Sequence, residues 1–162
     1  MRQLAFDTHD HHRCIAATLK SAETQCAKAG LHFTPVRRRV LELLATEHRA
    51  MGAYELLDHL RAEGLGSQPP VIYRALDFLV GHGFAHKLER LNAFVACCHP
   101  GADHSPAFLI CRNCDAVAEI RAQGARALLG DAAHAAGFAV DRAVIEAMGT
   151  CPACQQASDA PA

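Results

Sequence analysis

Four cysteines in the second half of the chain have the types and spacing of metal ligands. They form two Cys-x-x-Cys pairs with 36 residues between them: Cys111, Cys114, Cys151 and Cys154. A two-residue spacer lets both sulfurs of one turn face the same ion, and four thiolates suit the tetrahedral coordination of zinc. Such a site is saturated, so it predicts a structural zinc rather than a catalytic one. The alternative, two unrelated redox or packing pairs, does not explain why both pairs border predicted strand ends.

Once those four are assigned, a second group of potential ligands remains: His86, Cys97, Cys98, His99, His104 and Glu119. They are spread over a predicted hairpin, its exit, a turn-rich connection and the second half of the chain, so a site that used all of these regions would bridge two units. Each histidine taken alone is more often a surface or packed residue than a ligand. Strand alternation puts Cys97 on the face of Val95 and Cys98 on the opposite face, which favours Cys97 as the sulfur ligand.

Length and composition limit the class of protein. The chain has 162 residues, of which 51% are hydrophobic and 20% charged, enough for one ordinary domain or two small ones. No apolar run approaches the roughly 20 residues of a membrane span, and no secretory signal is visible after Met1, so we expect a cytoplasmic protein. In a reducing compartment, eight cysteines are more typical of metal ligands or small buried side chains than of disulfides.

Helical periodicity and turn signals organise the first part of the chain. After a helix over about 14–29, apolar spacing predicts three short helices: 35–47, 53–63 and one that follows Pro69-Pro70. Two strands, 84–88 and 93–97, then form a hairpin. Three helices with tight turns, the last carrying Arg74 near its start, are typical of a helix-turn-helix, and the hairpin adds a wing.

The second part of the chain predicts a small α/β unit. Strands over 107–111 and 116–120 surround the first cysteine pair, a helix covers 125–136, and a strand over 138–148 returns to the second pair. The fold class is therefore α+β, a winged helix-turn-helix domain followed by a small α/β domain with a four-cysteine zinc site. The expected divisions are a mobile arm, the winged-helix domain, a hinge, the α/β domain and a disordered tail: 1–13, 14–97, 98–106, 107–154 and 155–162.

Charge alone does not identify the partner. Residues 1–90 carry 12 Lys/Arg against 10 Asp/Glu, or +2, while residues 91–162 carry 4 against 7, or −3. Thirteen of the 16 basic residues are arginine, which suits bidentate contacts with phosphate and guanine. The absence of Trp makes single-strand stacking a poor explanation.

Several motifs together resemble the ferric uptake regulator (Fur) superfamily of metal-sensing repressors, and within it the zinc uptake regulators. The resemblance covers about residues 14–154. It rests on Thr34-Pro35 with Arg37 to Arg39, Tyr73-Arg74-Ala75-Leu76, Gly83-Phe84-Ala85-His86-Lys87 and both cysteine pairs. The chain departs from the family at Val71-Ile72, where relatives often carry a hydroxyl residue, so a helix cap there must come from Ser67 or from no side chain at all.

The resemblance implies site residues and partners. The α/β domain would be a dimerisation domain. A regulatory zinc would bind His86, Cys97, His104 and Glu119, and a structural zinc the four paired cysteines, giving two zinc ions per protomer. Arg74, Tyr73 and Tyr54 would contact DNA. Asp58 and Arg61 resemble positions where neighbouring dimers meet on DNA, although a solvated pair within one helix explains them equally well.

These implications predict a non-enzymatic, zinc-responsive transcriptional repressor. It would bind double-stranded operator DNA of dyad symmetry as a homodimer or as pairs of dimers, and control zinc uptake or homeostasis genes. One alternative is a family member that senses iron, manganese or peroxide, although thiolate and imidazole ligands favour zinc. A second is a zinc hydrolase with Glu119 as the general base, and a third is a redox-switched protein. Neither of the last two explains the helix-turn-helix pattern.

Overall fold

The computed structural model describes residues 11–47, 49–98, 106–141 and 143–158. They fall into two compact units, an N-terminal unit with described residues 11–98 and a C-terminal unit with described residues 106–158. Among these residues, no helix combines the length and apolar character that a bilayer crossing requires. The α+β class predicted from the sequence is confirmed.

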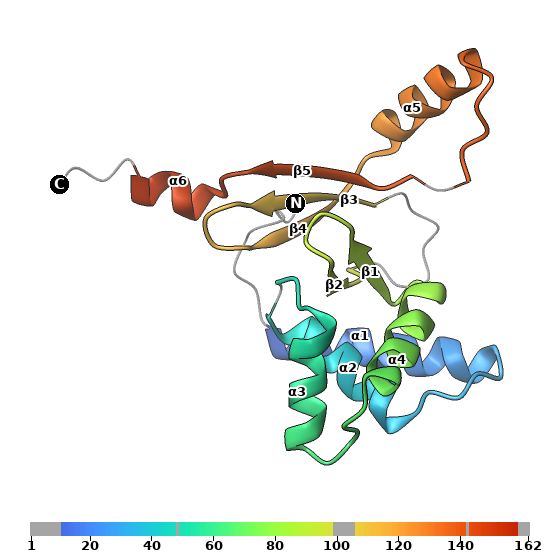
Figure 1. The fold of residues 1–162 in the computed structure, drawn as a ribbon, viewed down its shortest axis with the longest axis vertical. Helices are drawn as coiled ribbons and strands as arrows, with labels where there is room; N and C mark the ends of the chain where they lie inside the picture. The colour runs from blue at the N-terminus through green and yellow to red at the C-terminus, as the bar shows by residue number, and fades with distance from the viewer. Residues whose placement is uncertain (1–10, 48, 99–105, 142, 159–162) are drawn as a thin grey trace. The chain divides into compact units, whose positions relative to one another are not determined.

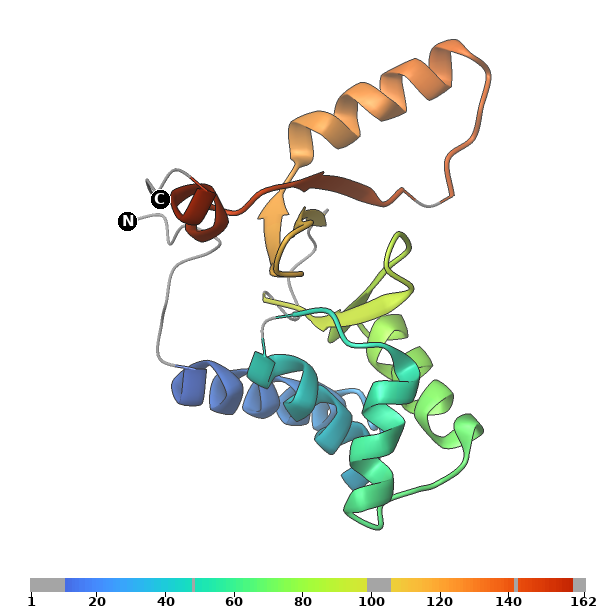
Figure 2. The ribbon, with the colours of Figure 1, turned by 60° about the vertical axis from the view of Figure 1, so that its left-hand side comes forward.

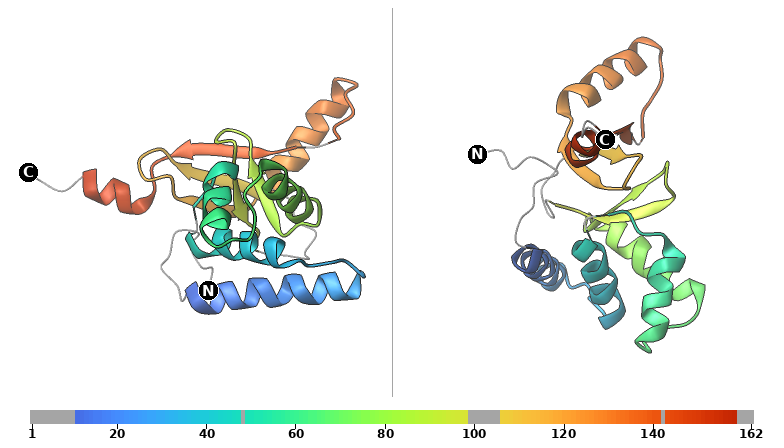
Figure 3. Two further views of the ribbon diagram at one scale, coloured as in Figure 1. Left: turned by 60° about the horizontal axis from the view of Figure 1, so that its bottom comes forward. Right: turned by 90° about the vertical axis from the view of Figure 1, so that its left-hand side faces the viewer.

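Four helices build the N-terminal unit: α1 His11–Lys28, α2 Pro35–Glu47, α3 Ala53–Ala62 and α4 Pro69–Gly81 (Figure 1). α1 and α2 lie side by side (Figure 3), and α4 packs against α2 and α3. Their shared core consists mainly of leucines that solvent does not reach, including Leu41, Leu44, Leu56, Leu57, Leu60, Leu76 and Leu79. The predicted helices are confirmed, although α1 begins at His11 rather than at residue 14.

Local signals start and stop these helices. Gly30 ends α1 with a φ of 66°, a left-handed conformation that a side chain would strain. At α2, the Arg37 N–H donates a hydrogen bond to Thr34 Oγ1 at 3.3 Å, and Pro35 occupies the first helical position. Of the two alternatives expected at the start of α4, a Ser67 cap is wrong and the absence of a side-chain cap is confirmed. The N-cap is Gln68, which makes no side-chain cap hydrogen bond, and prolines at the first two helical positions have no N–H to be capped.

A hairpin completes the N-terminal unit. β1 Ala85–Leu88 pairs antiparallel with β2 Ala93–Ala96, with His86 opposite Val95. Met51 forms two backbone hydrogen bonds with Phe94, both 2.9 Å long, so the segment before α3 extends the same sheet. Helices α2 to α4 followed by this hairpin form the predicted winged helix.

The C-terminal unit contains β3 Pro106–Cys111, β4 Val117–Arg121, α5 Gln123–Ala135, β5 Ile145–Gly149 and α6 Pro152–Ser158. β3 is central, antiparallel to β4 and parallel to β5. α5 extends away from these strands (Figures 1 and 2). The strand predicted over 138–148 is wrong in its first part, because only Ile145–Gly149 pairs with β3. α6 was not predicted and covers residues 155–158 of the expected tail.

Gly66 offers a test of how α3 is joined to α4. A Cβ built on Gly66 would lie 2.8 Å from Val71 Cγ1, so alanine must displace the Val71 side chain in the first turn of α4. We expect Gly66→Ala to lower the free energy of unfolding by about 1–3 kcal/mol in urea titrations. Gly81, where a Cβ would meet nothing within 4 Å, is the matched control. Gly81→Ala should leave stability unchanged or raise it by up to about 1 kcal/mol. Equal effects of the two variants would contradict this account.

Candidate metal centre

The parallel pairing of β3 with β5 brings the two cysteine pairs together. In that register Cys111, the last residue of β3, lies opposite Gly149, the last residue of β5. Parallel strands end at the same edge of a sheet, so the turn that carries Cys114 and the segment that carries Cys151 leave from one edge. Arg112 N–H donates to Gly149 O at 2.9 Å and prolongs the ladder to this point. Cys154 follows within α6, which begins at Pro152.

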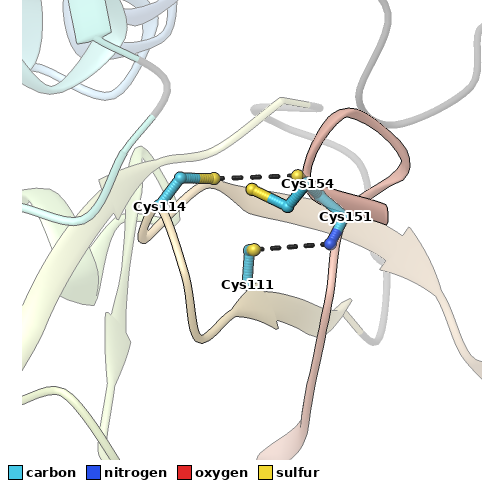
Figure 4. A group of neighbouring side chains, drawn as sticks. All are labelled: Cys111, Cys114, Cys151 and Cys154. Atoms are coloured by element: carbon cyan, nitrogen blue, oxygen red, sulfur yellow. Dashed lines mark hydrogen bonds between the residues drawn. The ribbon is translucent and has the colours of Figure 1, made fainter. Parts of the chain in front are cut away.

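The four sulfurs converge with the spacing that a tetrahedral zinc requires. They lie within 4.8 Å of one another, and the Cys114 and Cys151 Sγ atoms are 3.7 Å apart (Figure 4). That separation is far longer than a disulfide bond of about 2.0 Å. Four sulfurs at about 2.3 Å from a central zinc would be about 3.8 Å from each other. The donor set therefore fits a structural zinc site, and the sequence prediction for these four residues holds in geometry.

Backbone N–H donors and the close approach of the thiols favour cation binding at this cluster. The Cys151 N–H donates a hydrogen bond to Cys111 Sγ at 3.3 Å. This bond, with further N–H groups of the turn, lowers the pKa of Cys111 from 9.0 to about 6. The neighbouring Cys151 and Cys114 thiols and burial raise the pKa of Cys154 to about 12. The opposite pKa shifts of Cys111 and Cys154 mean that a thiolate at the first makes deprotonation of the second costly, and a divalent cation would remove that cost.

A second pair of potential ligands forms within the N-terminal unit alone. Cys97 N–H donates to Phe84 O at 2.9 Å, so Cys97 continues the β1–β2 ladder opposite Phe84. Residues 84 and 86 of a strand share a face, and Cys97 therefore lies on the face of His86. A His86 ring nitrogen is within 4.8 Å of Cys97 Sγ. Cys97 is 1% exposed, whereas Cys98 is an exposed residue.

The other two predicted ligands of this second group are placed differently. Glu119 is half-buried on β4 of the C-terminal unit, opposite Phe108 in the β3–β4 ladder. His104 and His99 lie outside the described residues. The four-residue set therefore stays a prediction.

The residues predicted to contact DNA lie on the surface of the N-terminal unit. Tyr54 in the first turn of α3 is 61% exposed, Tyr73 on α4 is 44% exposed, and Arg74 beside it is exposed. Their exposure is consistent with either a DNA contact or a solvated surface. Asp58 and Arg61 form an ion pair of 3.0 Å within α3, and Arg61 Nε also donates to Ser67 O. That pairing is the intrahelical arrangement expected as the alternative to a contact between dimers.

Sequence reasoning missed the exposed apolar face of the C-terminal unit. None of the residues of α5, all of which the structure describes, is buried. The large exposed side chains of this unit include Leu128 at 73%, Leu129 at 45% and Phe138 at 66%. Adjacent leucines in a short amphipathic helix were the available signal, but a helix periodicity does not say whether its apolar stripe meets its own chain or another.

Comparison with known proteins shows the family to which this chain belongs. The profile of the ferric uptake regulator family matches residues 28–148. The chain belongs to the ferric uptake regulator family. Among curated members, the zinc uptake regulation protein of Escherichia coli strain K12 is 42% identical over 137 residues, which are 84% of this chain and 80% of that protein.

Solved structures of family members agree. A zinc uptake regulator complexed with zinc and DNA has 39% sequence identity and a TM-score of 0.85, covering 90% of this chain and 98% of that one. The crystal structure of holo XcZur has 42% identity and a TM-score of 0.79, covering 86% and 98% of the two chains. The resemblance inferred from sequence motifs, both to the family and to its zinc uptake regulators, is confirmed.

Replacing one ligand of the four-cysteine cluster tests its structural role. We expect Cys114→Ser to unfold the C-terminal unit, because structural zinc sites contribute apparent free energies of about 10–16 kcal/mol and a serine hydroxyl does not replace the thiolate. Bound zinc should fall by about one ion per chain, and amides of β3 and β5 should lose hydrogen-exchange protection while α2 and α4 keep theirs. Cys98→Ser, at an exposed position, is the control and should change neither quantity. Retained protection of β3 and β5 in Cys114→Ser would contradict the assignment.

Proposed function

We propose that this chain is a zinc-responsive transcriptional repressor that binds operator DNA as a homodimer when its regulatory zinc site is filled, and so controls zinc uptake or homeostasis genes. The observation that carries the proposal is the similarity, along 90% of the chain, to a zinc uptake regulator solved with both zinc and DNA. The function is binding and not catalysis, and it needs three parts: a metal-sensing site, a DNA-reading surface and a dimer contact.

The regulatory site is proposed on His86, Cys97, His104 and Glu119. Support comes from the shared hairpin face of His86 and Cys97 and from the burial of Cys97, which shields its sulfur from water. One thiolate, two imidazoles and one carboxylate suit zinc better than iron or manganese, which favour more oxygen and nitrogen donors. This choice argues against an iron- or manganese-sensing relative. Four protein ligands also leave no open position for a hydrolytic water, which argues against a hydrolase.

The metal response follows from where these ligands lie in the chain. His86 and Cys97 belong to the winged-helix unit, whereas Glu119 belongs to the C-terminal unit. Ligands drawn from both units favour one arrangement of the DNA-reading unit when they share an ion, and half-sites on DNA select a set distance between recognition helices. Typical coupling free energies of about 1–3 kcal/mol would change DNA affinity by about 5–150-fold, and operator DNA would raise zinc affinity by the same factor.

The four-cysteine cluster completes a count of two zinc ions per protomer. Its role is structural, because the C-terminal unit has a small sheet and a helix, α5, without buried residues. A unit of about 50 residues is near the size at which a hydrophobic core alone is marginal. A shared zinc ion would link the turn after β3 to α6 and so stabilise this edge of the sheet. Its ligands would be the thiolates of Cys111, Cys114, Cys151 and Cys154.

Exposed apolar residues support a homodimer. Leu128 and Leu129 on α5, together with Phe138 and Met148, expose large apolar side chains in one small unit. Several large exposed apolar side chains in one small unit are typical of protein interfaces, and most soluble homo-oligomers close by two-fold symmetry. A two-fold dimer in turn explains dyad symmetry in the operator, since each protomer reads one half-site.

DNA reading is proposed for α4, with Arg74 and Tyr73 exposed in its first two turns and Tyr54 at the start of α3. Arginine is suited to bidentate hydrogen bonds with guanine in the major groove. Loading of several dimers through Asp58 and Arg61 would require these two residues to exchange their intrahelical pair for partners on a neighbouring dimer.

A DNA-binding titration against buffered free zinc tests the central proposal. The duplex is one that the purified protein enriches from a random-sequence pool in the presence of zinc. We expect affinity to rise about 5–150-fold with zinc, and Fe(II) or Mn(II) at comparable free concentration to give little response. Cys97→Ser should remove the response and leave a folded dimer, whereas Cys98→Ser should respond as the wild type does. An equal response to Fe(II) would overturn the zinc assignment.

Arg74→Ala separates base reading from phosphate contact. If Arg74 hydrogen-bonds a guanine, the variant loses about 1–3 kcal/mol of discrimination at a single base pair of each half-site. Binding to single-base variants of the enriched duplex measures this loss. Uniform weakening across all sequences, with a smaller salt dependence, would show that Arg74 contacts only phosphate.

A further inference from the structure

Arg37 makes a contact that its position in a run of three arginines does not reveal. Its guanidinium carbon lies 3.7 Å from the centre of the Phe78 ring. The same guanidinium donates a hydrogen bond from Nη1 to the His32 carbonyl oxygen. A cation over the face of an aromatic ring is attracted by the ring quadrupole, and the carbonyl fixes the orientation of the guanidinium plane. The side chain therefore joins the first turn of α2 to α4.

Phe78 also contacts two other aromatic rings. The His82 ring centroid is 4.5 Å away and the Phe84 centroid 6.4 Å away, and Phe33 reaches the same group through Phe84 at 6.4 Å. These separations lie in the favourable range for tilted aromatic pairs. The cluster thus connects the loop before α2, the second half of α4 and the start of the wing, all within the N-terminal unit.

Phe78 also shares a helix face with the proposed base-reading residue. Arg74 lies four residues before Phe78 on α4, so the two are neighbours on one side of the helix. Helical side chains lean toward the N-terminus of their helix, so we expect the Phe78 side chain to lie on the side of the turn that carries Arg74. Phe78 is half-buried and Arg74 is exposed. A contact that fixes the Phe78 side of α4 therefore also fixes the direction in which Arg74 leaves the helix.

We propose that Arg37 is a positioning residue for DNA reading: through Phe78 it fixes the rotation of α4 about its own axis and so the direction of Arg74. This inference rests on the proposed DNA-binding function and adds a residue to it. A single well-defined direction matters because a bidentate contact with one base tolerates little misplacement, whereas a phosphate contact tolerates more.

Arg38, the next residue, provides a matched control. It has the same charge on the same helix, is exposed, and forms an ion pair with Glu23 of α1 instead of an aromatic contact. If Arg37 acted only as positive charge near DNA, Arg37→Gln and Arg38→Gln would behave alike. A positioning role predicts that they differ.

The test uses the full chain with zinc, the duplex enriched by the wild type, and its single-base variants. Phe78→Leu removes the ring and keeps an apolar side chain, whereas Phe78→Tyr keeps the ring. We expect Arg37→Gln and Phe78→Leu each to lower discrimination at the base pair read by Arg74 by about 3–10-fold. The double variant should lose no more than either single one, since both remove the same contact. Phe78→Tyr and Arg38→Gln should keep wild-type discrimination.

Salt dependence distinguishes positioning from direct contact. We expect the slope of log affinity against log salt to be unchanged in Phe78→Leu and Arg37→Lys, whereas loss of a phosphate contact lowers it by about one. Arg37→Lys keeps the charge but not the flat stacked group, so it should lose discrimination and serves if Phe78→Leu fails to fold. A reduced slope with intact discrimination in Arg37→Gln, or wild-type discrimination in a folded Phe78→Leu, would overturn the inference. A wild-type chain that enriches no duplex would instead contradict the proposed function.

Discussion

The parallel pairing of β3 with β5 is the constraint on which the C-terminal unit depends. It aligns the ends of two strands that are far apart in the sequence, and so brings four thiols within 4.8 Å of one another. Without a bound cation, such a group of thiols resists further deprotonation, as the opposite pKa shifts of Cys111 and Cys154 indicate. Sheet and metal site therefore stabilise each other, because the strands align the ligands and a bound cation would hold the strand ends together.

The N-terminal unit is stabilised in a different way, by its hydrophobic core. Its leucine-rich core fixes the helices without any metal, and the residues that the core does not use form the functional surface. The wing contributes His86 and Cys97 from one hairpin face, while α4 exposes Tyr73 and Arg74. In the proposed function, a rigid scaffold with both metal ligands and DNA-reading residues would let a metal signal reach DNA without refolding, because only the arrangement of the scaffold would need to change.

Much of this organisation could be predicted from local signals. Thr34-Pro35 marks the start of α2 and Gly30 the end of α1, because both act through backbone geometry within a few residues. Predictions failed where distant parts of the chain decide the outcome. The described residues between α5 and Ile145 include apolar side chains typical of a strand but do not pair with β3. α6 was missed because a helix of seven residues, one of them Cys154, is too short to show a helical periodicity in the sequence.

The sequence by itself determined the chemistry: two Cys-x-x-Cys pairs, an imidazole and thiolate set, and an arginine at the start of a recognition helix are all visible in residue types and spacing. Only the tertiary structure decided which groups meet. It put the Cys114 and Cys151 sulfurs 3.7 Å apart and stacked Arg37 on Phe78. The physical reason is that spacing along the chain governs contacts within a turn or a helix, whereas contacts between elements depend on strand register and packing.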